Sequence, residues 1–323
     1  MTKADVLLAC QKQREQYPRT ADAIESYVEA ADFMVTSIAQ VIREGDLFWK
    51  MAEEVLGLLE EMSGPNYAVR RESLVRYTYE YLKAQVAYTK RGSYAADSFN
   101  DVNERVYANA EVMDGFYLDG LLLTQAFWPG HLRMNLFYQE SFLKRLKPDV
   151  RFCEVGVGQG WFFTQALSAR PQSHGTGLDI SPFSLNYTAA LAHAREIDPA
   201  RFELRTGDAQ AGLGLTAVSM DASVCGEVLE HVSRPVDVVR HIVEVLRPGG
   251  IAFFTAPALS DAVDHLYEFR SDQEVLDTIV EGGLRPVDHL SISLSEFSTS
   301  GRAWDPTILT SVVAVKPESQ GGG

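Results

Sequence analysis

A glycine-rich turn between a strand pattern and a helix pattern constrains the fold of this chain more than any other stretch. The segment VRFCEVGVGQGW, residues 150–161, leads from four apolar residues, interspersed with Arg151 and the acidic Glu154, into Gly156, Gly158 and Gly160. Glycine allows the positive φ of a tight turn, and its missing Cβ lets a ligand lie against the backbone at a helix N-terminus. The segment therefore predicts a strand–turn–helix unit that binds a ligand.

The spacing of these glycines argues against a dinucleotide as that ligand. The fingerprint GxGxxG would place its third glycine at position 161, where this chain has Trp161, and the pyrophosphate of a dinucleotide needs close approach to the backbone. The third glycine instead comes one residue earlier, and an acidic residue stands two positions before the first. This arrangement favours a ligand without phosphate at the turn, such as an aminoacyl sulfonium nucleoside.

Composition and charge narrow the class of protein. The chain has 323 residues, of which 46% are apolar, enough for two domains or for one large domain with an appendage. The net charge of -15 and the lack of a Lys/Arg cluster argue against nucleic acids and acidic membranes as partners. The N-terminus lacks the apolar core of a signal peptide, and no run reaches the length of a membrane span. We therefore expect a globular protein of the cytoplasm.

The cysteines and histidines give no local sign of a disulfide framework or a metal site. Cys10, Cys153 and Cys225 are too few and too scattered for disulfides, and none lies at metal-ligand spacing from a second Cys or a His. The same holds for the spacing of five histidines, His174, His193, His241, His265 and His289. The sequence therefore predicts no metal site.

The pattern of apolar residues changes near residue 148. Helical spacing recurs over residues 21–43, 46–62, 67–90 and 131–147 with no strand signal between them, which predicts an all-helical domain over residues 1–147. From 148 to 318, strand patterns alternate with helix patterns. This predicts an α/β, doubly wound, mostly parallel, Rossmann-like sheet of seven strands with an antiparallel last strand. Residues 319–323 are predicted to be a disordered tail.

Acidic residues occur where the predicted strands end. Doubly wound sheets bind ligands beyond the carboxyl ends of their strands, and Glu154, Asp179, Asp208 and the segment CGEVLEHV (residues 225–232) all fall there. A carboxylate at Asp179 can accept both hydroxyls of a ribose, and one at Asp208 can accept an adenine amino group. A single Asp at a strand end is commonly a helix cap or turn residue, so only all four features in this order indicate a ligand site.

The segments FCEVGVGQG, GLDIS, TGDAQ, CGEVLEHV and LRPGG resemble the ordered motifs of the class I S-adenosylmethionine (SAM)-dependent methyltransferases, over about residues 148–316. The resemblance implies that Glu154 and the glycine backbone hold the methionyl part of SAM, and that Cys225 and Glu227 lie beside the sulfonium. It implies the ribose, adenine and methionyl contacts of a full SAM site at Glu154, Gly156, Gly158, Gly160, Asp179, Ile180, Asp208, Ala209 and Cys225.

The helix pattern directly before the glycine strand carries candidates for the methionyl end of SAM. Residues 116–138 are rich in aromatic and polar side chains that could form a lid. Arg133 is a candidate partner for the carboxylate, with Asn135 close by on the same helix. Tyr138 is the first candidate for a catalytic contact, because its ring can meet a cation and its hydroxyl can hold a carboxylate. His231, oriented by Glu230, is a candidate base. For all these residues the alternative is structural packing.

The sequence leads to a SAM-dependent methyltransferase that acts on a small-molecule metabolite enclosed beneath the helical domain. Methyl transfer needs mainly alignment of nucleophile, methyl carbon and sulfur, and the sequence identifies neither the nucleophile nor the need for a base. Two alternatives stay open. One is an enzyme of the same fold that cyclises SAM itself to azetidine-2-carboxylate and methylthioadenosine; the other is a non-catalytic SAM-binding or scaffold protein. Monomer and homodimer are both compatible with the sequence.

Overall fold

The computed structural model describes residues 1–92, 98–297 and 305–318, so the predicted tail at 319–323 lies outside the described residues. Up to Arg145 the described chain is helical. Its elements are α1 (Lys3–Gln13), α2 (Pro18–Ala30), α3 (Met34–Ile42), α4 (Asp46–Ser63), η1 (Gly64–Asn66), α5 (Tyr67–Arg71), α6 (Ser73–Arg91), α7 (Phe99–Val102), η2 (Asn103–Tyr107), α8 (Ala110–Val112), η3 (Met113–Tyr117), α9 (Leu118–Phe127), α10 (Pro129–Phe137), η4 (Tyr138–Phe142) and η5 (Leu143–Arg145).

Three of the four long helices expected from apolar spacing are interrupted. The segment expected as one helix over 21–43 forms α2 and α3, because Ala31 is extended, with φ −155° and ψ 122°. The segment 67–90 is divided into α5 and α6 at Glu72, and 131–147 changes after Phe137 into a π-helical turn and then a 3-10 turn. These breaks let successive pieces turn different faces toward the core, which one straight helix cannot do.

From Arg151 onward the chain builds one sheet in the order β3-β2-β1-β4-β5-β7-β6. Strands β1 to β5 pair with one another in parallel, and β7 is antiparallel to both β5 and β6. The predicted fold class is confirmed, with β7 next to the edge. The elements are β1 (Arg151–Val155), α11 (Trp161–Ala169), β2 (His174–Asp179), α12 (Pro182–Ala194), η6 (Pro199–Arg201), β3 (Phe202–Thr206), β4 (Met220–Gly226), η7 (Leu229–His231), α13 (Pro235–Val245), β5 (Leu246–Ala258), α14 (Asp272–Glu281), β6 (Arg285–Ser293), η8 (Leu294–Phe297) and β7 (Ile308–Val315).

The two faces of the sheet pack on different partners. Successive side chains of a strand point to opposite faces, so Phe152 and Phe253 join one hydrophobic cluster while Cys153 and Phe254 join another. The second cluster contains α13 and α14. The first contains α11, α12 and much of the helical N-terminal part, Ile24 included. The helical part therefore shares a hydrophobic core with the sheet.

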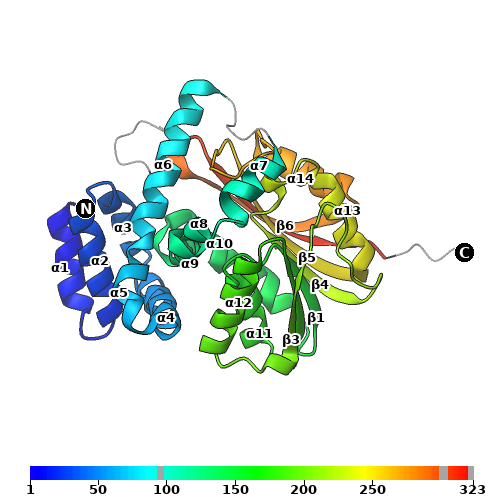
Figure 1. Cartoon of the computed structure of the whole chain (residues 1–323), viewed down its shortest axis with the longest axis horizontal. Helices are drawn as coiled ribbons and strands as arrows, with labels where there is room; N and C mark the ends of the chain where they lie inside the picture. The colour runs from blue at the N-terminus through cyan, green and yellow to red at the C-terminus, as the bar shows by residue number, and fades with distance from the viewer. Residues whose placement is uncertain (93–97, 298–304, 319–323) are drawn as a thin grey trace, which may run out of the picture.

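The N-terminal helices α1 to α5 lie to one side of the sheet, and the long α6 runs between them and the carboxyl-terminal half of the chain (Figure 1). Helices α9 and α10 occupy the middle of the molecule, and α10 contacts β6 and β7. Among the described residues, no helix combines the length and the apolar character needed to cross a lipid bilayer.

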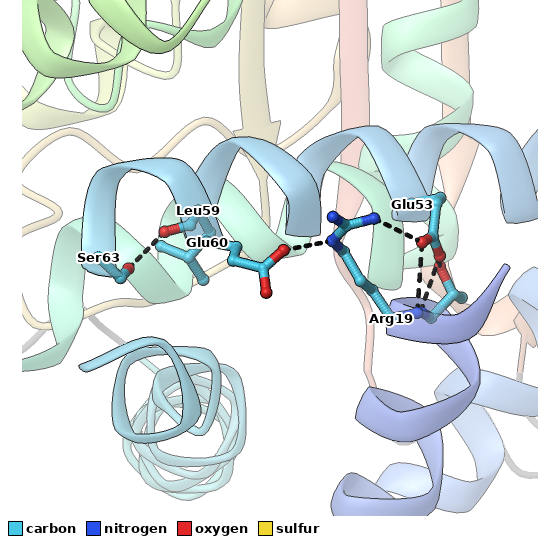
Figure 2. Close-up of polar contacts among 6 residues, drawn as sticks. Arg19, Glu53, Leu59, Glu60 and Ser63 are labelled. Atoms are coloured by element: carbon cyan, nitrogen blue, oxygen red, sulfur yellow. Dashed lines mark hydrogen bonds and ion pairs between the residues drawn. The ribbon is translucent and has the colours of Figure 1, made fainter. Parts of the chain in front are cut away.

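A carboxylate from α4 anchors the N-terminus of α2. Tyr17 precedes α2 without a side-chain cap, so the first N–H groups need another acceptor. Glu53 accepts hydrogen bonds from the N–H of Thr20 at 2.9 Å, from the Thr20 hydroxyl at 2.8 Å and from the N–H of Arg19 at 3.2 Å. Figure 2 shows Glu53 at the N-terminal end of α2 and Glu60 on the other side of Arg19. The Nε of Arg19 donates a hydrogen bond to Glu60 at 2.6 Å.

We predict different losses in the free energy of unfolding when these two glutamates are replaced. Glu53→Ala leaves the fully buried Thr20 without an acceptor, and we expect it to lower the free energy of unfolding by about 1–3 kcal/mol. Glu60→Ala is the matched control, because it removes an ion pair whose side chains are 42% and 45% exposed, and it should cost less than about 1 kcal/mol. Urea denaturation measures both changes. Equal losses would contradict the capping role of Glu53.

Candidate active site

A cavity of about 510 Å³ lies at the carboxyl ends of the central strands. One side is formed by the segments that follow β1, β2, β3 and β4, which is where doubly wound sheets bind ligands. The other side is formed by α3, α6, α9 and α10 and by parts of residues 257–265, 294–297 and 305–309. None of the described residues that line the cavity is Lys or Arg.

The glycine turn after β1 has a conformation that side chains would disturb. Gly156 and Gly160 have φ of +70° and +76°. A Cβ on Gly156 would lie 2.4 Å from Cγ2 of Val228, and a Cβ on Gly160 would lie 2.8 Å from the side chain of Thr188. Gly156 and Gly158 line the cavity, whereas Gly160 caps α11 and packs against α12. Gly160 therefore supports the turn by packing instead of lining the cavity.

Asp179, the last residue of β2, is held by the backbone on both sides. Its Oδ2 accepts the N–H of Gly158 at 2.9 Å, and its Oδ1 accepts the N–H of Ser181 at 2.8 Å. Burial raises the pKa of Asp179 above its usual value. The carboxylate thus ties the end of β2 to the glycine turn at the cavity wall. Three further predicted nucleoside contacts line the same cavity: Ile180, Asp208 and Ala209.

Glu154, on β1 just before the turn, is buried at 2% exposure and lines the cavity. Its Oε2 has no hydrogen-bond partner among the described residues. Burial, followed by the charge of Asp179, raises the pKa of Glu154 well above its usual value. A buried carboxylate oxygen without a partner is costly, so this position favours a ligand that brings a cationic group.

Cys225 lies within β4 and Glu227 lies just after it, and their side chains have different surroundings. The Cys225 side chain is fully buried in the cluster on the α13 and α14 face and does not line the cavity, which corrects the predicted SAM contact. Glu227 has a φ of +53°, and its N–H donates to the carbonyl of Thr255 at 3.0 Å and to its hydroxyl at 2.9 Å. This turn of the backbone directs Glu227 to the cavity, where burial raises its pKa and its Oε1 has no partner among the described residues.

A histidine and carboxylate cluster follows Glu227 along the cavity wall. Nδ1 of His231 lies 2.9 Å from the carbonyl oxygen of Asp264, and its Nε2 lies 3.5 Å from Oε1 of Glu230. Neither side-chain oxygen of Glu230 has a hydrogen-bond partner among the described residues. Burial, with the charge of Glu227, raises the pKa of Glu230 well above its usual value. His231 and Glu230 therefore lie close together at the cavity.

Two tyrosines connect the helical part to this cluster. The hydroxyls of Tyr107 and Tyr117 donate to Oδ2 of Asp264 at 3.1 and 2.6 Å. Although burial alone would raise the pKa of Asp264, the neighbouring His231 and His265 and these hydroxyls hold it below its usual value. Tyr117 belongs to the aromatic stretch that the sequence indicated. Tyr107, Asp264 and His265 belong to no local motif, and only the folded chain brings them to the cavity.

Comparisons with known proteins agree with this geometry. Residues 153–252 match a family model described as a methyltransferase domain. A stretch of 105 residues is 33% identical to the ubiquinone biosynthesis O-methyltransferase of Paracidovorax citrulli (strain AAC00-1), covering 32% of this chain and 42% of that protein. A stretch of 126 residues is 32% identical to the thiol S-methyltransferase TMT1B of Mus musculus, covering 38% and 48%. The match thus spans less than half the length of each relative.

A solved structure shares the fold over a longer stretch. The phosphoethanolamine N-methyltransferase 2 of Haemonchus contortus, in complex with SAM, aligns with a TM-score of 0.52 at 19% identity, covering 69% of this chain and 61% of that chain. This likeness agrees with the strand order β3-β2-β1-β4-β5-β7-β6 observed here. The α/β part of the chain therefore has a methyltransferase-like fold, and its residues 153–252 are similar to a methyltransferase domain. In this methyltransferase domain, β1, β2, β3 and β4 carry the residues at the cavity.

The helix before the methyltransferase domain does not supply the contacts predicted from it. Arg133 forms ion pairs with Glu44 at 3.2 Å and Glu296 at 3.7 Å and does not line the cavity. Asn135 is fully buried; its amide donates to the Gln125 carbonyl at 2.9 Å, and its Oδ1 accepts the Trp161 indole N–H at 2.6 Å. Both expectations are corrected, because these side chains bond to other parts of the protein. From the same aromatic stretch, Tyr117, Trp128 and His131 do line the cavity.

Tyr138 lies in the core of the methyltransferase domain. It is fully buried, its hydroxyl donates to the carbonyl of Phe162 at 2.9 Å, and its ring packs against Phe142, Phe162 and Phe253. It does not line the cavity. The π-helical turn that begins at Tyr138 places the ring against the sheet, so the expected contact with SAM is replaced by packing.

This position predicts a stability effect for Tyr138. Tyr138→Ala should lower the free energy of unfolding by about 3–5 kcal/mol, since it removes a buried ring. Tyr138→Phe removes only the hydroxyl and should cost about 1 kcal/mol. We expect both folded variants to bind S-adenosylhomocysteine (SAH) with unchanged affinity, measured by calorimetry beside thermal melting. A Tyr138→Ala variant that keeps its melting temperature but loses SAH binding would restore the ligand contact.

Proposed function

We propose that this protein transfers the methyl group of SAM to a small-molecule acceptor held in the same cavity. The observation that carries the proposal is the shape of the site. The strand ends of the methyltransferase domain and the facing helices bound one cavity of about 510 Å³, a size typical of small-molecule sites. The acceptor must fit between the sheet and the helices, which favours a metabolite over a nucleic acid.

The polar groups of the cavity match the parts of SAM. Glu154, with its unpartnered Oε2, is suited to the ammonium group of the methionyl part, next to the backbone of Gly156 and Gly158. Asp179 is suited to the ribose hydroxyls, because its two oxygens are already oriented by backbone N–H groups. Ile180, Asp208 and Ala209 would surround the adenine. This order along the strand ends supports the proposal that SAM is the methyl donor.

The charges of the cavity bear on the acceptor. Glu227, Glu230 and Asp264 stand together on one wall, and no Lys or Arg lines the cavity among the described residues. A phosphate or carboxylate on the acceptor would meet these acidic groups without a basic partner, at a cost in electrostatic free energy. We therefore infer that the acceptor is neutral or cationic.

The proposed reaction is an in-line displacement. A lone pair of the acceptor attacks the methyl carbon while the electrons of the S–C bond return to sulfur, which gives SAH and the methylated acceptor. A proton on the attacking atom then passes to a base. Glu227 is the first candidate for this base, because it lines the cavity and burial raises its pKa. His231 is the second candidate, through Nε2, since Nδ1 is bonded to Asp264.

The SAM site makes a prediction for binding. Asp179→Ala should weaken the binding of SAH roughly tenfold to a hundredfold, because two ribose hydroxyls lose their acceptor and Gly158 loses its partner. Asp198→Ala is the matched control, because Asp198 caps a backbone N–H beside β3 and does not line the cavity. Calorimetry gives both affinities, with melting curves to confirm folding. Equal affinities for the two variants would remove Asp179 from the site.

A product assay tests the reaction itself. We expect SAH to form only when a nucleophilic acceptor from a metabolite panel is added to protein and SAM. The Asp179→Ala variant measures the background breakdown of SAM. Methylthioadenosine formed from SAM alone, above this background, would instead mean that the amine of SAM attacks its own Cγ and breaks the Cγ–S bond, as in the cyclase alternative. Tight SAM binding with neither product would indicate the non-catalytic alternative.

A further inference from the structure

Three side chains at the cavity wall form a compact group, which we call the Glu230 cluster: Glu230, His231 and His265. One potential ligand atom from each lies within 4.8 Å of the others. Glu230 is fully buried and His265 is only 7% exposed, yet all three line the cavity. The cluster lies beyond the residues assigned to SAM, and only His231 among its members is a candidate for the base.

The backbone fixes the orientation of both imidazoles. Nδ1 of His231 lies 2.9 Å from the carbonyl oxygen of Asp264, and Nδ1 of His265 lies 2.8 Å from that of Ser260. A carbonyl oxygen only accepts hydrogen bonds, so each Nδ1 carries a proton and each neutral ring has its lone pair on Nε2. Histidines that bind metals have this arrangement, in which the distal N–H donates to a carbonyl or carboxylate.

The lone pair of His231 faces a carboxylate. Its Nε2 lies 3.5 Å from Oε1 of Glu230, and neither side-chain oxygen of Glu230 has a hydrogen-bond partner among the described residues. Two acceptors at this separation in a buried site need a positive group between them. A tetrahedral zinc ion, with ligands about 2.0–2.2 Å away, keeps neighbouring ligand atoms roughly 3.3–3.5 Å apart. The His231–Glu230 pair has this separation, and the three ligand atoms together lie within 4.8 Å of one another.

We propose that Glu230, His231 and His265 bind a divalent transition-metal ion, of the zinc type, through one carboxylate and two Nε2 atoms. Two imidazoles and one carboxylate favour zinc or cobalt over magnesium or calcium, which take mainly oxygen ligands. Three protein ligands leave a position for a cavity ligand, as in catalytic zinc sites. If His231 binds such an ion, it cannot also act as the base. Glu227 is then the base for the proposed reaction.

The absence of metal spacing in the sequence is consistent with this site. Glu230 and His231 are adjacent on η7, but His265 comes from the segment after β5, so no short motif contains the set. Burial lowers the pKa of His265 to about 4, which keeps its imidazole neutral and able to bind an ion. The competing occupant is a proton on Glu230, whose pKa burial also raises. That proton could join Glu230 to His231 without a metal ion.

The test is metal uptake by the full chain, without a histidine tag and without SAM. After dialysis against a chelator, Co²⁺ and Zn²⁺ are titrated in by calorimetry, and the visible absorbance of Co²⁺ reports its ligand geometry. We expect one equivalent of either ion. Glu230→Gln and His265→Gln should each weaken binding at least tenfold. His241→Gln is the matched control, because Nδ1 of His241 also lies 2.9 Å from a carbonyl, that of Ala209, but outside the cluster, and it should bind like the unaltered protein.

Two results would overturn the site. One is no uptake of either ion at millimolar concentration, which would assign the cluster to a shared proton. The other is uptake that Glu230→Gln and His265→Gln leave unchanged. SAH binding by each variant gives an independent measurement of folding and of the SAM site. A protein that binds SAH without metal would refute the metal site alone, and one that binds metal without SAH would refute the proposed function alone.

Discussion

Buried carboxylates without basic partners are the constraint on which the active centre depends. Glu154, Glu227 and Glu230 each have a buried oxygen with no hydrogen-bond partner in the described part of the chain, and the described cavity lining contains no Lys or Arg. An ionised carboxylate out of water costs several kcal/mol unless a proton or cation compensates it. The cavity is therefore matched to positive groups, such as a sulfonium, an ammonium or a metal ion.

The sheet sets the positions of these groups. Each acidic segment follows a parallel strand, so the strand order brings the ends of β1, β2, β3 and β4 to one edge. The bond from the N–H of Gly158 to Asp179 joins two of these ends at 2.9 Å. The helical part then covers this edge, and it shares a hydrophobic core with the sheet. Because the two parts pack together, the cavity has a defined opposite wall, which supplies Tyr107 and Tyr117.

How far the sequence could be interpreted depended on whether the determining contacts are local. The strand–turn–helix unit and Asp179 could be predicted, because their signals lie within a few residues. Cys225 and Glu227 are two residues apart, so in a regular strand their side chains would point to the same face of the sheet. Only the positive φ of Glu227 turns its side chain in another direction. The position of Tyr138 in the core could not be predicted, because Tyr138 begins a π-helical turn that interrupts the regular helical spacing. His265 reaches the cavity only through the tertiary fold, so no spacing rule could find it.

Elsewhere the chain does pair its buried acids. Asp119, 3% exposed, accepts from Nε and Nη2 of Arg70 at 2.8 and 2.6 Å and from the Tyr187 hydroxyl at 2.8 Å. A fold that satisfies a structural carboxylate so fully could have done so at the cavity too. The unpartnered glutamates there store an electrostatic cost in the ligand-free protein, and a cationic ligand removes that cost when it binds. Ligand binding and folding stability are therefore coupled through the same carboxylates, and a basic residue placed beside them would stabilise the fold while competing with the ligand for the site.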